Sequence, residues 1–240
     1  MDLCPPLHQS GIAVVAPFDF ALDRELWRWV PDDVTLHITR MRYVPLAVTT
    51  ELAVRISDPE LVARGVTDIA AVSPLVAAYA CTSGSFVGGL AGEAALVAAM
   101  IAAGAPAAVT TSGALLAALR DLGITRLATV TPYTADLTAG LSVFLAEADV
   151  RVVASSGLGL TSDIWTVPQE VTAGLVRDTD MDDAQALFIS CTNLPTYDLI
   201  APLEEELGKP VLTANQVTMW SALTAIGHKA VGPGQRLLKS

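Results

Sequence analysis

The chain has 240 residues, of which 52% are hydrophobic and 16% are charged, and its formal net charge is −11 at pH 7. This composition is typical of a folded protein with a large buried core and excludes a disordered chain. A nucleic-acid partner is not expected, because phosphate binding needs clustered Lys and Arg side chains.

The N-terminal residues indicate no export signal, since Met1-Asp2-Leu3-Cys4 offers neither a basic start nor an apolar core. The longest apolar run, residues 94–109, is interrupted by Gly104 and Pro106 and is too short to cross a membrane. The three cysteines have no metal-type spacing and fit a reducing compartment. We therefore expect a soluble, cytoplasmic protein without a membrane partner, in which Cys4 has no functional context.

Short apolar segments alternate with helical segments along the chain, which is the pattern of a parallel α/β sheet. A loop is expected before Asp58. Strands are predicted at residues 11–16, 34–39, 109–111, 127–131, 150–155 and 211–212, and in the apolar runs that end at Cys81 and Cys191. Helices are predicted at residues 22–30, 58–69, 92–103, 114–122, 137–148, 169–178, 201–207 and 217–226.

One motif occurs twice in the chain. An apolar run ends in Cys81-Thr82, and a second one ends in Cys191-Thr192. After each run come a Gly-x-Pro sequence, a strand, a threonine and a helix, starting from Gly104 and from Gly208. A chance pair of cysteines would not share these surroundings. We infer an α/β fold of two pseudo-symmetric, doubly wound parallel-sheet halves, with the active site in the cleft between them.

The predicted boundary between the halves follows from this repeat. The first half covers residues 1–108 and is completed by the C-terminal segment 216–240, while the second half covers residues 109–215. Ligands of open α/β sheets bind at the carboxyl ends of the strands, where both cysteines are expected.

The two cysteines are the main candidates for catalysis. A single cysteine after a strand is most simply an inert core residue, but two at equivalent places favour a function. A thiolate can act as a base or a nucleophile. Thiols on opposite faces of a cleft can move a proton from one side to the other, or attack and protonate across a double bond. We predict Cys81 and Cys191 as catalytic residues.

Polar side chains follow the same strands. Hydroxyl groups in such places often serve only as helix caps, but their concentration at several strand ends favours a cradle for a carboxylate. The three histidines share no pattern and no lysine follows a glycine loop, which argues against a Ser-His-Asp triad, a histidine metal site and a P-loop. We expect neither a metal nor a cofactor. The predicted substrate-binding residues here are Thr82, Ser83, Tyr133, Thr192 and Asn193.

With these motifs the chain resembles the aspartate/glutamate racemase superfamily, and within it the branch of maleate cis-trans isomerases and arylmalonate decarboxylases. The resemblance implies a cofactor-independent enzyme in which Cys81 is the nucleophile or first base and Cys191 the proton donor on the opposite face. It also implies that hydroxyl groups and amides around Thr82-Ser83 and Thr192-Asn193, together with Tyr133, hold the carboxylates of a small substrate. The motifs that carry it are Ala80-Cys81-Thr82-Ser83, Thr131-Pro132-Tyr133, Ile189-Ser190-Cys191-Thr192, Gly208-Lys209-Pro210-Val211 and the closing segment from Gly232 to Leu238.

The decarboxylases of this branch keep only the second cysteine, so the presence of Cys81 favours isomerisation or racemisation. The leading prediction is an isomerase similar to maleate isomerase. The alternatives are an amino-acid or hydantoin racemase, an arylmalonate-type decarboxylase, a relative associated with ectoine degradation and, ranked last, a non-catalytic carboxylate binder. A homo-oligomer, a dimer or a tetramer, is also expected.

Two positions depart from the pattern of the isomerases. Asp19 stands where they carry an Asn that contacts a substrate carboxylate, and Asp163 lies in a shortened segment where they have a second binding Asn. Two ionised carboxylates in contact repel each other by roughly 1–4 kcal/mol. Either Asp19 points away from the substrate, or the substrate differs from maleate at that end.

Overall fold

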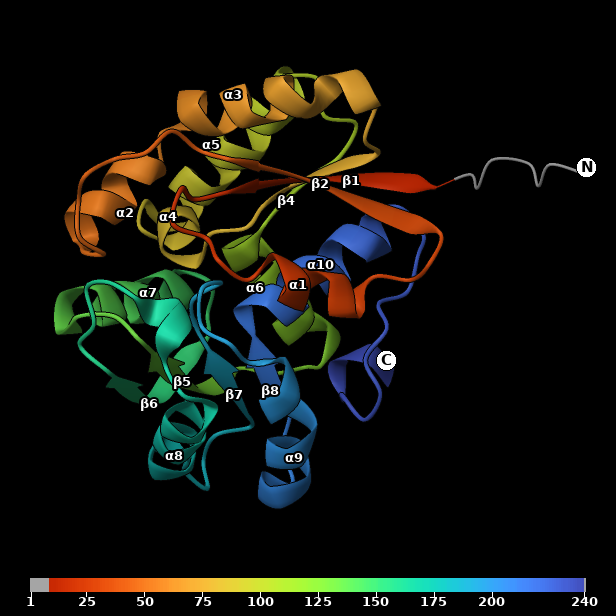
Figure 1. The fold of residues 1–240 in the computed structure, drawn as a ribbon. Coiled ribbons are helices and arrows are strands. Elements are labelled where there is room, and N and C mark those ends of the chain that lie inside the picture. The colour runs from red at the N-terminus through yellow and green to blue at the C-terminus, as the bar shows by residue number, and fades with distance from the viewer. Residues whose placement is uncertain (1–8, 240) are drawn as a thin grey trace, which may run out of the picture.

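Two parallel four-stranded sheets form the framework of the protein, in a computed structural model that describes residues 9–239. The strand order is β2-β1-β3-β4 in the first sheet and β6-β5-β7-β8 in the second (Figure 1). Because the order is the same in both sheets, the halves are related by an internal pseudo-symmetry. The predicted α/β fold of two doubly wound halves is confirmed. Cys4 lies outside the described residues.

The elements alternate along the chain as the apolar pattern predicts. The strands are β1 (Ser10–Ala16), β2 (Val34–Arg40), β3 (Val76–Tyr79), β4 (Ala108–Thr110), β5 (Arg126–Thr131), β6 (Arg151–Gly157), β7 (Ala186–Ile189) and β8 (Val211–Thr213). The helices are α1 (Asp23–Leu26), α2 (Thr50–Ile56), α3 (Pro59–Ile69), α4 (Thr82–Phe86), α5 (Gly89–Ala102), α6 (Thr111–Asp121), α7 (Ala135–Glu147), α8 (Gln169–Thr179), α9 (Tyr197–Leu207) and α10 (Ala214–Ala225). Short 3₁₀ helices cover Trp27–Trp29, Ala70–Val72, Ile164–Thr166 and Leu237–Lys239.

Both faces of the first sheet are buried, as its continuous apolar strands require. Successive side chains of β1 point to opposite faces. Ile12 and Val14 share a core cluster with Leu223 of α10, whereas Val15 shares another with Val66 of α3. No helix in residues 9–239 is long and apolar enough to cross a membrane.

The last helix of each half packs against the sheet of the other half. Helix α6 follows β4 of the first sheet, but its Leu115 and Leu119 lie in the core cluster of the second. Helix α10 follows β8 of the second sheet, and its Met219 packs with β1 and β3 of the first. The two helices lie between the sheets and contact each other (Figure 1). This exchange of helices joins the two halves tightly. The boundary between the halves, predicted between residues 108 and 109, stays a prediction.

Two short helices depart from the expectations. Helix α2 lies where a loop is expected, and it is only two turns long, so its buried Leu52 and Ile56 hardly show a helical period. Helix α4 contains the weak helix formers Ser and Gly, so its sequence does not predict a helix. Its C-terminal end is held by a hydrogen bond of 2.7 Å between Ser85 Oγ and Ser112 Oγ of helix α6. The helix expected at residues 22–30 is reduced to α1 and a 3₁₀ turn.

The close approach of α3 to β1 gives a test of this packing. A Cβ atom added to Gly65 would lie 2.6 Å from Cγ1 of Val15, whereas one added to Gly174 of α8 would have no heavy atom within 4 Å. We expect Gly65→Ala to lower the free energy of unfolding by about 1–3 kcal/mol through overpacking. Gly174→Ala is the matched control and should raise it by up to about 1 kcal/mol, because Ala favours the helix. Urea unfolding measures both, and equal effects of the two substitutions would contradict this account.

Candidate active site

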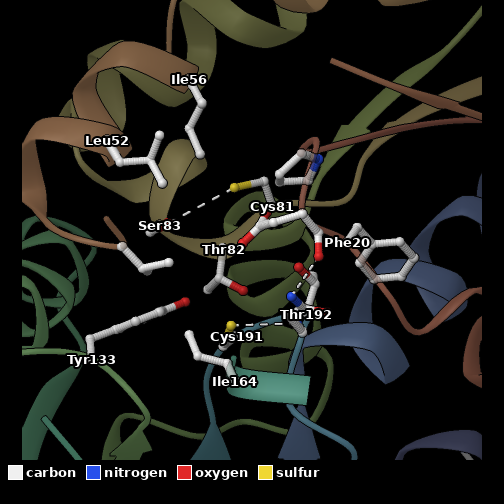
Figure 2. Close-up of a pocket in the computed structure, with 14 residues that line it drawn as sticks. Phe20, Leu52, Ile56, Cys81, Thr82, Ser83, Tyr133, Ile164, Cys191 and Thr192 are labelled. Atoms are coloured by element: carbon white, nitrogen blue, oxygen red, sulfur yellow. Dashed lines mark hydrogen bonds between the residues drawn. The ribbon is translucent and has the colours of Figure 1, made fainter. Parts of the chain in front are cut away.

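A pocket lies at the carboxyl ends of β1 and β3 on one side and of β5 and β7 on the other. It contains about 390 Å³ of space when the solvent at its open mouth is included. Figure 2 shows Cys81 and Cys191 on opposite sides of this space, with Thr82 and Tyr133 facing it. The residues that line it are Pro17, Asp19, Phe20, Val48, Leu52, Ile56, Cys81, Thr82, Ser83, Tyr133, Ile164, Cys191, Thr192 and Asn193.

Cys81 lies between β3 and α4 and caps the N-terminus of that short helix. Its Sγ accepts the backbone N–H of Gly84 at 3.3 Å and lies 3.9 Å from Oγ of Ser83. Burial raises the pKa of the Cys81 thiol to about 11, which outweighs the lowering by the Gly84 amide and by the Tyr79 hydroxyl. The Cys81 thiol is therefore protonated at neutral pH in the free protein.

Cys191 follows β7 in a backbone conformation that is rare for any residue except glycine. Its φ is +87°, which costs of order 1–3 kcal/mol and is typical of functional sites. Its Sγ accepts the N–H of Asn193 at 3.4 Å. Burial raises its pKa to about 12, against the lowering by Asn193 and by Tyr133, and the charge of Asp19 raises it further. For both cysteines, desolvation thus outweighs the amide-rich turns that are expected to stabilise a thiolate.

The threonines that follow the two cysteines are equivalent in sequence but differ in their contacts. The hydroxyl of Thr192 donates to the carbonyl of Ala80 at 3.2 Å. This bond connects the two halves at the residue that precedes Cys81 in the sequence. The hydroxyl of Thr82 is buried and has no hydrogen-bond partner. Thr82 also lines the pocket, and its hydroxyl has no existing hydrogen bond to lose if it bonds to a ligand there. The pseudo-symmetry is therefore broken at the site itself.

The side chain of Asn193, a predicted substrate ligand, already connects the two halves. Its Oδ1 accepts the N–H of Ala21 at 2.9 Å, and its Nδ2 donates to the carbonyl of Asp19 at 2.9 Å. These bonds fix the loop after β1 against the loop that carries Cys191. Asn193 thus positions Asp19, which lines the pocket.

A buried carboxylate behind the Cys191 loop is a feature that sequence reasoning missed. Glu25 accepts hydrogen bonds from the Thr196 N–H at 2.9 Å and from Nδ2 of Asn215 at 2.9 Å. Asn215 also donates to the carbonyl of Thr192 at 2.8 Å. Burial raises the pKa of Glu25, and the hydrogen bonds from Asn215 and Thr196 lower it. A lone Glu in a short amphipathic segment gives no sequence signal of this role.

The other predicted residues divide between the pocket and the surface. Thr82, Ser83, Tyr133 and Thr192 line the pocket, and the Tyr133 hydroxyl faces Cys191. Asp163 is exposed, accepts a hydrogen bond from Ser162 at 2.8 Å and is not among the lining residues, although its neighbour Ile164 is. The structure thus does not bring Asp163 into the site.

The apolar wall of the pocket is a further feature that sequence reasoning missed. It comes from Val48, Leu52, Ile56 and Ile164, of which the first three lie in and before the unexpected helix α2. The only sequence signal was the i, i+4 spacing of Leu52 and Ile56. Within residues 9–239, no group of three or more His, Cys, Asp or Glu could hold a metal ion.

Two related parallel α/β halves with one thiol from each in a shared pocket define the two-cysteine class of the racemase superfamily. The model of the arylmalonate decarboxylase family matches residues 58–238, and the chain belongs to this family. The maleate isomerase of Nocardia farcinica is 31% identical to it over 216 residues, which are 86% of this chain and 84% of that protein. These matches confirm the predicted branch, and the chain is an enzyme of this family.

Solved structures agree in fold and in the placement of the halves. A liganded double mutant of arylmalonate decarboxylase superposes with a TM-score of 0.86 at 28% identity, covering 97% of this chain and 100% of that one. A mutant of the Nocardia farcinica maleate cis-trans isomerase with a covalently bound succinylcysteine intermediate superposes with a TM-score of 0.83 at 27% identity, covering 95% and 98%.

The broken symmetry of the threonines predicts unequal effects on stability. Thr192→Val should lower the free energy of unfolding by about 1–2 kcal/mol, because a buried hydrogen bond is lost and the Ala80 carbonyl is left without this donor. Thr82→Val should leave it unchanged or raise it slightly, because the buried hydroxyl has no partner. Urea denaturation of both variants measures the difference, and equal losses would contradict the assignment.

The raised pKa values predict slow thiol chemistry in the free protein. Thiolate increases as pH approaches the pKa, so iodoacetamide labelling of Cys81 and Cys191 should speed up about tenfold per pH unit from pH 7 to 10, without a plateau. The measurement uses a Cys4→Ser background and a model peptide thiol as the reference. A plateau below pH 9 for either cysteine would show that its thiolate is stabilised after all.

Proposed function

We propose that the protein is a cofactor-independent isomerase that moves a small unsaturated carboxylate between its cis and trans forms, using Cys81 and Cys191. The observation that carries the proposal is a pocket shared by the two halves, in which one thiol from each half lies on opposite sides. A covalent adduct through cysteine is the chemistry named for the mutant isomerase with succinylcysteine.

The proposed reaction begins with the Cys81 thiolate, whose proton has passed to solvent. Its sulfur forms a bond to one alkene carbon, and the π pair takes the proton of the Cys191 thiol at the neighbouring carbon. The former double bond is now single and can rotate. Cys191, now a thiolate, then takes the proton back, the carbon–sulfur bond breaks, and the double bond returns in the other geometry.

The substrate carboxylate would be held by groups that are close to the thiols and have capacity for hydrogen bonds. The unpartnered hydroxyl of Thr82, with Ser83 and Tyr133, would donate to it and to the negative charge that develops in the adduct. Because burial disfavours the Cys81 thiolate, the rate should rise with pH above neutrality.

A decarboxylase is the second candidate, because the family model that matches the chain is that of arylmalonate decarboxylase. In this reaction Cys191 alone would protonate an enediolate after carbon dioxide leaves, and the apolar wall of the pocket would hold an apolar substituent. A racemase that uses the same two thiols stays an alternative. The homo-oligomeric state and the cytoplasmic location also stay predictions.

Serine substitutions separate these functions. We expect Cys81→Ser and Cys191→Ser each to lower kcat for cis-trans isomerisation at least about 1,000-fold, because a serine hydroxyl is a far weaker nucleophile and acid than a thiol. Proton NMR of maleate, its monoamide and related acids follows the reaction, and deuterium incorporation from solvent reports α-proton transfer. Retention of most activity by Cys81→Ser on an arylmalonate would favour the decarboxylase.

A further inference from the structure

The pocket contains one charged side chain and nothing to neutralise it. Of the described residues that line the pocket, Asp19 is the one acid, and none is Lys, Arg or His. No ion pair within residues 9–239 involves Asp19. The nearby guanidinium of Arg40 is committed elsewhere, since it pairs with Asp23 at 2.6 Å and donates to the Phe20 carbonyl at 2.9 Å.

The position of Asp19 is fixed by both halves of the protein. Its carbonyl accepts from Nδ2 of Asn193 at 2.9 Å, and the loop after it is held by the hydrogen bond from Ala21 N–H to the same side chain. Asp19 itself lies within a turn in which the N–H of Phe20 donates to the carbonyl of Pro17. The backbone at Asp19 is thus fixed, and from this position Asp19 lines the pocket.

The charge of Asp19 reaches the space between the two thiols. It raises the pKa of Cys81 and of Cys191, which line the pocket from opposite halves. A ligand that bridges the two sulfurs therefore lies in the field of this carboxylate. Burial also raises the pKa of Asp19 itself above its ordinary value.

We propose that Asp19 determines substrate specificity: the site takes a monocarboxylate whose other end carries an uncharged hydrogen-bond donor, such as a primary carboxamide, and disfavours a second carboxylate there. This rests on the proposed isomerase function. An ionised carboxylate accepts hydrogen bonds from an amide NH₂ group. It repels a second carboxylate, and more strongly in a pocket of low dielectric than in water.

The first experiment compares maleate with its monoamide by proton NMR. The wild-type enzyme should show kcat/KM at least about tenfold higher for the monoamide at pH 8, and Asp19→Asn should reduce this preference at least about tenfold. Asp136→Asn on the exposed first turn of α7 removes the same charge outside the pocket and should leave the preference unchanged. Equal use of both substrates by the wild type, or a preference that Asp19→Asn does not change, overturns the proposal.

A pH series separates a charge effect from a change of shape. The ratio of kcat/KM for maleate, Asp19→Asn over wild type, should be largest near pH 8 and fall toward one as pH decreases through the pKa of Asp19. The reason is that the protonated carboxyl group no longer repels the substrate. The other ionisable groups that face this region are Cys81, Cys191, Tyr133 and Tyr79, and burial raises the pKa of all four, so they stay neutral over this range. A ratio independent of pH overturns the electrostatic role.

A binding measurement keeps this inference distinct from the proposed reaction. Succinate and its monoamide have no double bond to isomerise, and calorimetry should show tighter binding of the monoamide to the wild type and loss of this difference in Asp19→Asn. If neither unsaturated acid is isomerised but this binding pattern appears, the isomerase function fails and the role of Asp19 stands. If neither saturated ligand binds and neither substrate reacts, both are wrong.

Discussion

The site depends on the way the two halves are held face to face. Each thiol follows a strand of its own sheet, and only the packing of one half on the other makes one pocket of the two strand ends. The exchange of α6 and α10 contributes to this packing, since each helix buries apolar side chains in the core of the other half. Hydrogen bonds from Thr192 to Ala80 and from Asn193 to the β1 loop then fix the distance across the cleft.

Desolvation is the dominant electrostatic effect in this pocket. It raises the pKa of Cys81, Cys191 and Asp19, although backbone amides donate to both sulfurs. A pocket that does not stabilise a thiolate in its empty state leaves that task to the substrate complex. This is consistent with an enzyme that protects its nucleophile from other electrophiles, and with selection of the substrate by the charge of Asp19.

The internal repeat has diverged at the residues that line the pocket. Strand order, cysteines and following threonines match in the two halves, but Cys81 caps a helix and Cys191 sits in a strained turn with φ of +87°. Of the equivalent threonines, Thr192 joins the halves by a hydrogen bond, and Thr82 has a buried hydroxyl without a partner. A symmetric fold thus carries two different thiols, which is consistent with the proposed reaction of one nucleophile and one proton donor.

The sequence by itself determined the fold class, the repeat and the two cysteines, because buried parallel strands are continuous apolar runs and the repeated motif lies at their ends. It could not show α2, whose two turns supply Leu52 and Ile56 to the pocket, nor Glu25 behind the Cys191 loop, since neither has a local signal. It also grouped Asp163 with Asp19, and only the tertiary structure separated the exposed residue from the one in the pocket. The local sequence pattern shows whether a residue is apolar and where a strand ends. Contacts between segments more than 100 residues apart, such as that of Asn193 with Asp19, decide which polar side chains meet and how deeply they are buried.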